Sequence, residues 1–318
     1  MRFDGQVAVV TGAGGGLGRE HALLLASRGA RVVVNDIGGS VTGDGSSDDA
    51  ANIVADEIRD RGGEAVADCH SVTTPEGGQA IVDTALNAWG RVDIVVNNAG
   101  IVGDAPFEDM TAARLDQLLD VHLKGAFHVT RPAWKVMQEN GYGRILNTSS
   151  AAGILGNENM SNYGSAKTGL IGMTRVLAAE GAAHNIKVNA VAPIALTRML
   201  SHSIDGAGAQ DDPAAKAVLD DLMNTYLKKL DPALVAPVVA FLTHRDCPVS
   251  GEIYTVGAGH VARLFIGRTK GFYNPALSVE DVRDHLDEIR DEAGYTVPGG
   301  TADEMGELFS TILASQSD

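Results

Sequence analysis

The sequence predicts an α/β protein with a doubly wound parallel sheet of seven strands and a helical C-terminal extension. Two observations lead to this prediction. Short runs of β-branched residues alternate with longer helical patterns through most of the chain, which is typical of a parallel sheet covered on both faces. After Gly259 that alternation stops. With 318 residues, 44% of them hydrophobic, and 38 glycines, the chain is large enough to bury the core of such a fold.

The expected strands and helices follow one another in order along the chain. Right-handed crossovers through the helices would place the strands in one sheet. The strands are QVAVVT from Gln6, ARVVVND from Ala30, EAVAD from Glu64, VDIVVNN from Val92, GRILNTS from Gly143, IKVNAVA from Ile186 and EIYTVG from Glu252. The helices lie near residues 16–28, 48–61, 76–89, 111–138, 162–184 and 214–243.

Two segments rich in Gly, Ser and Asp interrupt the alternation. Residues 37–49 read as a long loop after the second strand, either a plain flexible insertion or a flap that covers a cofactor. Residues 201–213 have the same composition after a later strand, where a mobile segment could serve as a substrate lid.

The last part of the chain carries two capped helix patterns and no further strand pattern. Ser278 with Asp281 precedes the first helix, and Thr301 with Glu304 precedes the second. A segment of this size would bury little core by itself. We therefore expect a sheet domain over residues 1–262 and a helical extension over residues 263–318 that packs on this domain or on a second subunit.

The charge and the cysteine content argue against several classes of protein. A net charge of −16 disfavours a nucleic-acid or anionic-membrane surface and leaves only local sites for anions. Cys69 and Cys247 make no disulfide framework, and no His/Cys cluster has the spacing of a metal site. No signal peptide and no membrane-spanning run is visible. The expectation is a cytoplasmic protein without metal, nucleic acid or membrane partner.

A glycine-rich segment, TGAGGGLG at residues 11–18, joins the first strand to the first helix. Glycines permit a tight turn and a close approach of the backbone to a ligand, and the amides of a helix N-terminus can face a diphosphate. Because a strand precedes this segment and a helix follows it, it predicts a dinucleotide site. The expected contacts are Gly12, Gly16, Leu17 and Gly18.

Asp36 ends the second strand, where a carboxylate can accept hydrogen bonds from an adenosine ribose. A 2′-phosphate about 4 Å away would meet a repulsion of about 4 kcal/mol per unit charge at an effective dielectric near 20. Asp36 therefore predicts NAD rather than NADP. Arg19 is the nearest basic residue in sequence that could offset the repulsion, although it could equally be solvated.

The fourth strand ends in Asn97, Asn98, Ala99 and Gly100, at the edge of the sheet where ligands bind in this architecture. A polar turn would explain these residues as well. Asn97 could both steady neighbouring strands and shape the cofactor cleft.

Residues 150–167 bring together a hydroxyl at Ser150, a phenol at Tyr163 and an amine at Lys167. If Tyr163 opens a helix, Lys167 lies one turn further along on the same face, and its ammonium favours the phenolate. Lowering the tyrosine pKa from about 10 to about 7 requires roughly 4 kcal/mol, which this cation and a charged cofactor ring could supply. Tyr163 would then be a general base. An ordinary amphipathic helix start shows the same spacing.

These motifs, in this order, resemble the short-chain dehydrogenases/reductases, a family with the Rossmann fold, over residues 5–260. The resemblance implies that Tyr163 is the catalytic base or acid, that Lys167 lowers its pKa and holds the nicotinamide ribose, and that Ser150 stabilises the substrate oxygen. It also implies cofactor contacts at Asn98, Ala99, Gly100, Pro193 and Thr197, with Thr197 at the carboxamide or a phosphate, and further lining around Val121.

Four stretches resemble one branch of this family, the (3R)-hydroxyacyl-CoA dehydrogenase domains of peroxisomal multifunctional enzymes type 2 and bacterial relatives that act on acyl-CoA thioesters or 17β-hydroxysteroids. They are VVVNDIGGSVTGDGS, VHLKGAFHVTRPAW, YGRILNTSSAAGILGN and YTVGAG. The resemblance implies an NAD-dependent oxidation of a secondary alcohol, with a (3R)-3-hydroxyacyl-CoA as the expected substrate. It further implies a homodimer or homotetramer joined through helices 111–138 and 162–184.

The alternatives are a 17β-hydroxysteroid dehydrogenase and an NADPH-dependent 3-oxoacyl carrier-protein reductase. Asp36 speaks against the second of these. A third alternative is a regulator that senses a nucleotide on the same fold. Such a protein catalyses no reaction, so the complete set of Ser150, Tyr163 and Lys167 speaks against it.

Three positions depart from the general family pattern. His122 stands where an asparagine usually completes the catalytic set, so it is either a proton-relay residue or a packed core residue. Ser71, before Val72, replaces the aspartate that usually holds adenine, so a weaker adenine hydrogen bond is implied. Ile194 replaces the glycine after Pro193, so a narrower pocket near the nicotinamide is expected.

A local basic cluster, Arg263, Arg268 and Lys270, could bind a CoA phosphate in this otherwise acidic protein. The same residues could equally be solvated or pair with acidic groups.

Overall fold

The computed structural model describes residues 1–205 and 225–315. The chain divides into two compact units, Met1–Arg263 and Leu264–Asp318. The first unit contains the sheet and the second is a helical segment, so the predicted α/β fold with a helical C-terminal segment is confirmed. The expectation that the second unit packs on the first or on another subunit stays a prediction.

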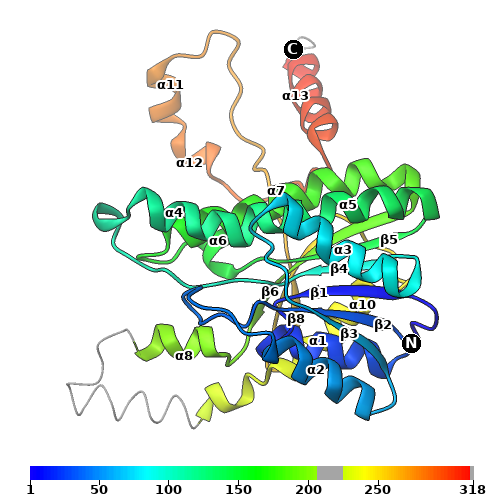
Figure 1. The fold of residues 1–318 in the computed structure, drawn as a ribbon. Helices are drawn as coiled ribbons and strands as arrows, with labels where there is room; N and C mark the ends of the chain where they lie inside the picture. The colour runs from blue at the N-terminus through cyan, green and yellow to red at the C-terminus, as the bar shows by residue number, and fades with distance from the viewer. Residues whose placement is uncertain (206–224, 316–318) are drawn as a thin grey trace. The chain divides into compact units, whose positions relative to one another are not determined.

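The first unit is built on an eight-stranded sheet (Figure 1). Strands β2 and β3 lie on one side of β1, and β4 and the later strands lie on its other side. Strands β1 to β7 pair in parallel. The carboxyl ends of β1 and β4 therefore meet at the point where ligands bind in such sheets. In spatial order the strands are β3 (Glu64–Asp68), β2 (Arg31–Asn35), β1 (Val7–Thr11), β4 (Ile94–Asn97), β5 (Gly143–Thr148), β6 (Ile186–Ile194), β7 (Ile253–Gly257) and β8 (His260–Leu264).

The prediction of seven strands was wrong by one, because β8 extends the edge of the sheet. It follows β7 through the two residues Ala258 and Gly259, both with positive φ (49° and 79°). Its residues are exposed or half-buried, so it shows no apolar run of the kind that reveals a buried strand.

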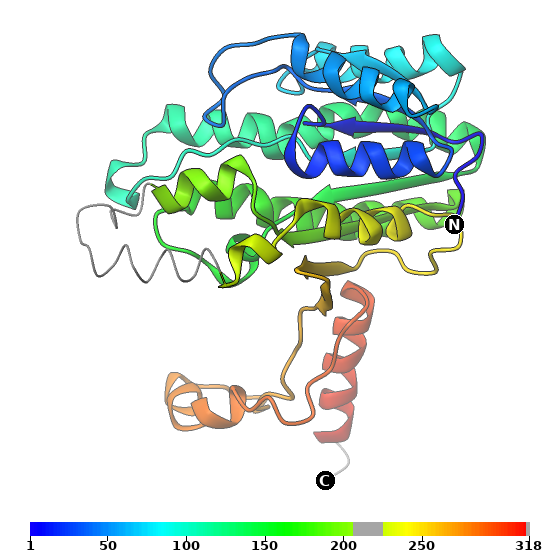
Figure 2. The same ribbon diagram turned by 90° about the horizontal axis from the view of Figure 1, so that it is seen from below.

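Helices cover both faces of the sheet, as Figure 2 shows from a second side. One face packs on α1 (Gly16–Ser27), α2 (Asp49–Asp60) and α10 (Ala236–Leu242), and the other packs on α3 (Pro75–Trp89), α5 (Gly125–Asn140) and α7 (Ser161–Gly181). Buried valines and isoleucines of the strands fill both layers. The apolar interior fixes the strand ends that carry the candidate site.

The predicted helix near 111–138 is divided into α4 (Ala112–Leu119) and α5 by a π-helical turn, Asp120–Lys124. This turn carries His122. Residues 120–124 contain neither glycine nor proline, so no helix-breaking residue marks this turn in the sequence.

The predicted helix near 214–243 is not continuous where the structure describes it. Two 3₁₀ turns, Leu227–Lys229 and Pro232–Leu234, precede α10. Pro232 has no N–H for a helical hydrogen bond, and Asp231 caps the turn that follows it. The remaining part of that prediction, residues 214–224, lies outside the described residues.

The second unit contains α11 (Val279–Asp284), α12 (Leu286–Ile289) and α13 (Thr301–Ser315). Ser278 and Asp281 form the predicted capping box, since each side chain binds the backbone N–H of the other residue. Arg268 lies 3.0 Å from carboxylate oxygens of both Glu304 and Glu307 on α13. These ion pairs join the start of the unit to its last helix.

Candidate active site

A cavity of about 700 Å³ opens at the carboxyl ends of the strands in the first unit. It brings together residues from the glycine-rich loop, the ends of β2, β4, β5 and β6, and helix α7. Except for Gly18, every residue that the sequence predicted for catalysis or cofactor binding lines it: Gly12, Gly16, Leu17, Asp36, Ser71, Val72, Asn98, Ala99, Gly100, His122, Ser150, Tyr163, Lys167, Pro193 and Thr197.

Gly18, in the first turns of α1, packs closely against the backbone of the glycine-rich loop. A Cβ at this position would lie 2.2 Å from the backbone oxygen of Gly12 and 2.7 Å from Asn98 Nδ2. Gly12 is itself in the left-handed region (φ 64°), and a Cβ there would lie 2.8 Å from Ala99 Cα. The loop and the end of β4 therefore approach each other at distances that only glycines allow.

Asn98 joins these two segments. Its Nδ2 donates hydrogen bonds to the backbone oxygens of Thr11 (3.0 Å) and Gly12 (3.1 Å). Thr11 Oγ1 accepts in return from the backbone N–H groups of Asn98 (3.0 Å) and Ala99 (3.1 Å). Asn97 instead steadies the sheet, because its Nδ2 donates to Asn147 Oδ1 on β5 (2.8 Å), and it does not line the large cavity.

Asp36 lies at the end of β2 with its carboxylate facing the glycine-rich loop. It accepts hydrogen bonds from the backbone N–H groups of Gly14 (2.8 Å) and Gly38 (2.7 Å), which fix its orientation in the cavity wall. Arg19 does not approach as a free cation, since its guanidinium lies 2.6 Å from Glu57 Oε1. No group of α1 therefore compensates for a phosphate placed near Asp36.

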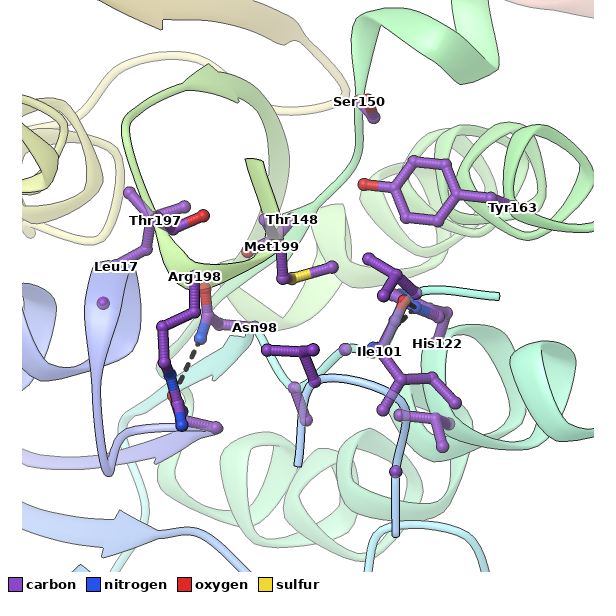
Figure 3. A pocket seen from close by; sticks show the side chains of 18 of the residues that line it. Leu17, Asn98, Ile101, His122, Thr148, Ser150, Tyr163, Thr197, Arg198 and Met199 are labelled. Atoms are coloured by element: carbon purple, nitrogen blue, oxygen red, sulfur yellow. Dashed lines mark hydrogen bonds between the residues drawn. The ribbon is translucent and has the colours of Figure 1, made fainter. Parts of the chain in front are cut away.

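The three reactive groups meet at one end of the cavity. Ser150 caps helix α6 (Ala151–Leu155), and its Oγ accepts the N–H of Ala152 (3.2 Å), which leaves the hydroxyl hydrogen available to a ligand. Figure 3 shows the Tyr163 hydroxyl pointing toward Ser150. Lys167 follows one turn later on α7, with Nζ 5.5 Å from the centre of the Tyr163 ring. The predicted spacing on one helical face is thus observed.

The pKa values of this group differ from the expectation. Burial raises the pKa of Tyr163, and the hydrogen-bonding influence of Ser150 opposes that rise. Lys167 is fully buried, and burial lowers its pKa to about 7. Its Nζ donates to the backbone oxygen of Thr148 at 2.6 Å. The predicted lowering of the Tyr163 pKa by Lys167 is therefore not found, because burial disfavours the charge on both groups.

His122 is buried within the π turn and lies edge-on to Tyr163, with ring centroids 5.3 Å apart. Its Nε2 lies 3.0 Å from the backbone nitrogen and 2.9 Å from the backbone oxygen of Ile101 (Figure 3). Its Nδ1 has no hydrogen-bond partner among the described residues, and His122 and Lys167 both line a small internal cavity. Burial and the charge of Lys167 hold the pKa of His122 well below 6.5, so the imidazole is neutral.

Replacing His122 with asparagine is expected to make the free energy of unfolding depend less on pH in mildly acidic solution. The folded protein keeps His122 neutral, whereas the unfolded chain takes up a proton below about pH 6.5. This contribution to stability is complete above that pH and falls as the pH drops, by up to about 1.4 kcal/mol per pH unit. Urea unfolding at several pH values between about 6.5 and 5 should show the wild-type slope to be the steeper. Equal slopes would mean that the buried imidazole is protonated.

The loop at residues 37–49 is anchored over the cavity. The backbone N–H of Val102 donates to Val41 O (2.8 Å), and Gln117 Nε2 donates to Thr42 O (3.0 Å). Val41 also lines the cavity. Of the two alternatives for this segment, a flap over the site fits the structure better than a plain insertion.

The sequence also predicts that residues 194–212 flank the pocket, and the start of this segment does so. Arg198, Met199 and Leu200, at the start of α8 (Arg198–Asp205), line the cavity. Their individual roles were not predicted, since in this stretch the family resemblance implies contacts only for Pro193 and Thr197. Most of the predicted lid, residues 206–213, lies outside the described residues.

The basic cluster predicted for a CoA phosphate is largely neutralised. Arg268 is paired with Glu304 and Glu307, and Arg263 lies 3.4 Å from Glu252. An arginine already held by two carboxylates is a poor phosphate ligand. The structure therefore does not favour this interpretation.

Two further features concern residues 1–205 and 225–315 only. Within these ranges no group of three or more His, Cys, Asp or Glu side chains could hold a metal ion. No helix there is both long and apolar enough to cross a membrane.

A sequence model of the short chain dehydrogenases matches residues 6–206. The chain belongs to this family. It is accordingly an oxidoreductase that acts on CH–OH groups. A short-chain type dehydrogenase/reductase of Mycobacterium tuberculosis is 44% identical over 295 residues, which cover 92% of this chain and 97% of that protein.

The resemblance to multifunctional enzymes is confirmed as well. Peroxisomal multifunctional enzyme type 2 of Drosophila melanogaster is 43% identical over 317 residues, 98% of this chain and 50% of that enzyme. The chain thus spans about half the length of that relative, whose full-length structure superposes with a TM-score of 0.78. A 7α-hydroxysteroid dehydrogenase, solved with NADH and 7-oxo glycochenodeoxycholic acid, is 36% identical with a TM-score of 0.70, over 81% of this chain and 95% of that one.

Proposed function

We propose that this protein is an NAD-dependent dehydrogenase that oxidises the hydroxyl group of a (3R)-3-hydroxyacyl-CoA to the 3-ketoacyl-CoA. The observation that carries the proposal is the meeting of Ser150, Tyr163 and Lys167 in one cavity with a dinucleotide-type glycine loop. The similarity to peroxisomal multifunctional enzyme type 2 supports this choice of substrate.

The residues present fit NAD. The glycine loop leaves the first-turn amides of α1 without a side-chain cap, and Asp36 is oriented at the end of β2 as a ribose acceptor. Asp36 would repel a 2′-phosphate, and Arg19 is engaged with Glu57. When bound, the nicotinamide supplies the hydride acceptor.

In the proposed reaction the phenol of Tyr163 first passes its own proton toward the neutral amine of Lys167, and the resulting phenolate oxygen then takes the proton of the substrate hydroxyl. Ser150 donates a hydrogen bond to the substrate oxygen as it becomes a carbonyl. The Lys167 pKa of about 7 suits an amine that takes up and releases a proton near neutral pH. His122, whose Nδ1 has no hydrogen-bond partner among the described residues, would continue this relay away from Lys167.

The cavity walls suit an apolar chain next to the reactive groups. Apolar residues that follow β4, precede α7, end β6 and begin α8 form this part of the lining: Ile101, Val102, Met160, Ile194, Met199 and Leu200. A fatty acyl chain or a steroid would bury apolar surface against them.

The direct test compares (3R)- and (3S)-3-hydroxyacyl-CoA thioesters of several chain lengths, with NAD or NADP, and follows the reduced cofactor by its absorbance. We expect turnover of the (3R) series with NAD. Turnover of the (3S) series alone, or a preference for NADP, would contradict the proposal.

A hydroxysteroid is the second candidate substrate. The 36% identity to a 7α-hydroxysteroid dehydrogenase solved with a bile acid favours it. A 17β-hydroxysteroid belongs in the same assay, and turnover of the steroid without any acyl-CoA activity would select this function. A 3-oxoacyl carrier-protein reductase is disfavoured by Asp36, which opposes NADP.

We further propose a cytoplasmic homodimer or homotetramer joined through the layer of α5 and α7. Phe127 on α5 and Val176 on α7 are large apolar side chains exposed by 49% and 56%. A subunit contact would remove this surface from water. Light scattering coupled to gel filtration measures the state, and a monomer at all concentrations would contradict the proposal.

A further inference from the structure

Arg198 is the first residue of α8 and extends from the segment after β6 toward the glycine-rich loop (Figure 3). A Cβ placed on Gly15 would lie 3.5 Å from Arg198 Nη2. A Cβ placed on Gly16 would lie 3.6 Å from Thr197 Cγ2. Two consecutive residues after β6 therefore lie directly against the loop that opens α1.

Arg198 brings a positive charge to this place. Among the described residues no carboxylate lies within ion-pair distance of its guanidinium. The nearby arginine of α1, Arg19, is bound to Glu20 and Glu57. Apart from histidines, the basic side chains among the described residues that line the cavity are Arg198 and Lys167. Lys167 is committed to the end of the cavity that holds Tyr163.

The loop beneath Arg198 is also positive in character. Helix α1 has twelve residues, its first turn contains no acidic residue, and Gly15 at its N-cap offers no side-chain acceptor. The N–H groups of the first turn and the helix dipole therefore attract an anion. The carboxylate of Asp36, which faces the loop, is held by the backbone N–H groups of Gly14 and Gly38.

We propose that Arg198 binds the diphosphate of the dinucleotide and closes this anion site from the side opposite the loop amides. The inference rests on the proposed cofactor-binding function and adds a residue to it. A guanidinium offers several N–H donors in a planar fork, which matches two phosphate oxygens at once. In a chain with a net charge of −16, such a cation offsets repulsion that loop amides alone would leave.

The test measures binding of ADP-ribose and of adenosine to the full-length protein by calorimetry, with adenosine measured by displacement if it binds weakly. Arg198→Gln removes the charge, and Arg198→Lys keeps the charge without the fork. Arg28→Gln is the matched control, because Arg28 is an exposed residue at the opposite end of α1 and does not line the cavity. Thermal unfolding of each variant checks that it is folded.

We expect Arg198→Gln to weaken ADP-ribose binding by about 10- to 100-fold, the usual effect of losing a charged hydrogen bond. Adenosine binding should stay within about twofold, since the nucleoside has no phosphate. Arg198→Lys should restore part of the affinity, and Arg28→Gln should bind as the wild type does. The salt dependence of ADP-ribose binding should also decrease in Arg198→Gln.

Two results would overturn the inference. The first is unchanged ADP-ribose affinity in Arg198→Gln, and the second is an equal loss for ADP-ribose and adenosine. If the wild type binds neither NAD nor ADP-ribose, the proposed function itself fails. Binding by the wild type with no effect at Arg198 removes only this inference.

Discussion

Replacing Tyr163 with phenylalanine is expected to lower kcat by about three orders of magnitude, within the range for loss of a general acid or base. The Tyr163 ring packs against His122, with the two ring centroids 5.3 Å apart. Phenylalanine keeps this packing and loses only the Oη that faces Ser150. Steady-state rates with the best 3-hydroxyacyl-CoA measure the effect. Calorimetry with NAD should give a Kd within about twofold of the wild-type value, because the change removes no charge.

Tyr142→Phe is the matched control. It removes the same hydroxyl from a residue outside the cavity, where the ring contacts the Arg144 guanidinium at 4.4 Å, a contact that phenylalanine preserves. The control should retain wild-type turnover. If Tyr163→Phe kept more than about a tenth of the wild-type rate, a proton-transfer role for this phenol would be excluded.

Replacing Gly18 with alanine is expected to have the largest effect on cofactor binding. The new Cβ would lie 2.2 Å from the backbone oxygen of Gly12, so the loop and α1 must move apart. We expect a loss of about 1–3 kcal/mol in the free energy of unfolding, as for other overpacked sites. A displacement of this kind should weaken NAD binding by about 100-fold, since the loop no longer presents its amides in one arrangement.

Gly306→Ala tests the same chemical change where there is space. A Cβ at Gly306, within α13, meets nothing within 4 Å. We expect unchanged NAD binding and a gain of about 0.5–1 kcal/mol in stability, because alanine is the better helix former. Urea unfolding and calorimetry measure both variants. A wild-type Kd for Gly18→Ala would show that the loop does not depend on its close contact with α1.

The order of elements and the place of the cofactor loop could be predicted because both leave periodic or short-range signals. Apolar runs predicted β1 to β7, and a strand followed by clustered glycines predicted the turn at Gly12. The exposed edge strand β8 and the π turn at His122 leave no such signal. Their existence depends on neighbours that are distant in sequence.

The reactive set was predictable for a related reason. Tyr163 and Lys167 are one helical turn apart, and local spacing alone placed them on one face. Their pKa values were not predictable, because burial depends on the whole fold around them. Arg198 was predicted only as part of a segment that flanks the pocket, since its approach to Gly15 spans the sheet and appears only when β1 and β6 are placed in space.

The contact between Gly100 and His122 makes these two positions mutually dependent in evolution. A Cβ at residue 100 would lie 2.5 Å from Cε1 of the imidazole, so alanine there conflicts with histidine at 122. A shorter side chain at 122 would relieve the conflict. The order of substitutions therefore matters: a lineage that carries histidine in the π turn cannot enlarge residue 100 first, and the same mutation is harmful or tolerated according to which partner is present.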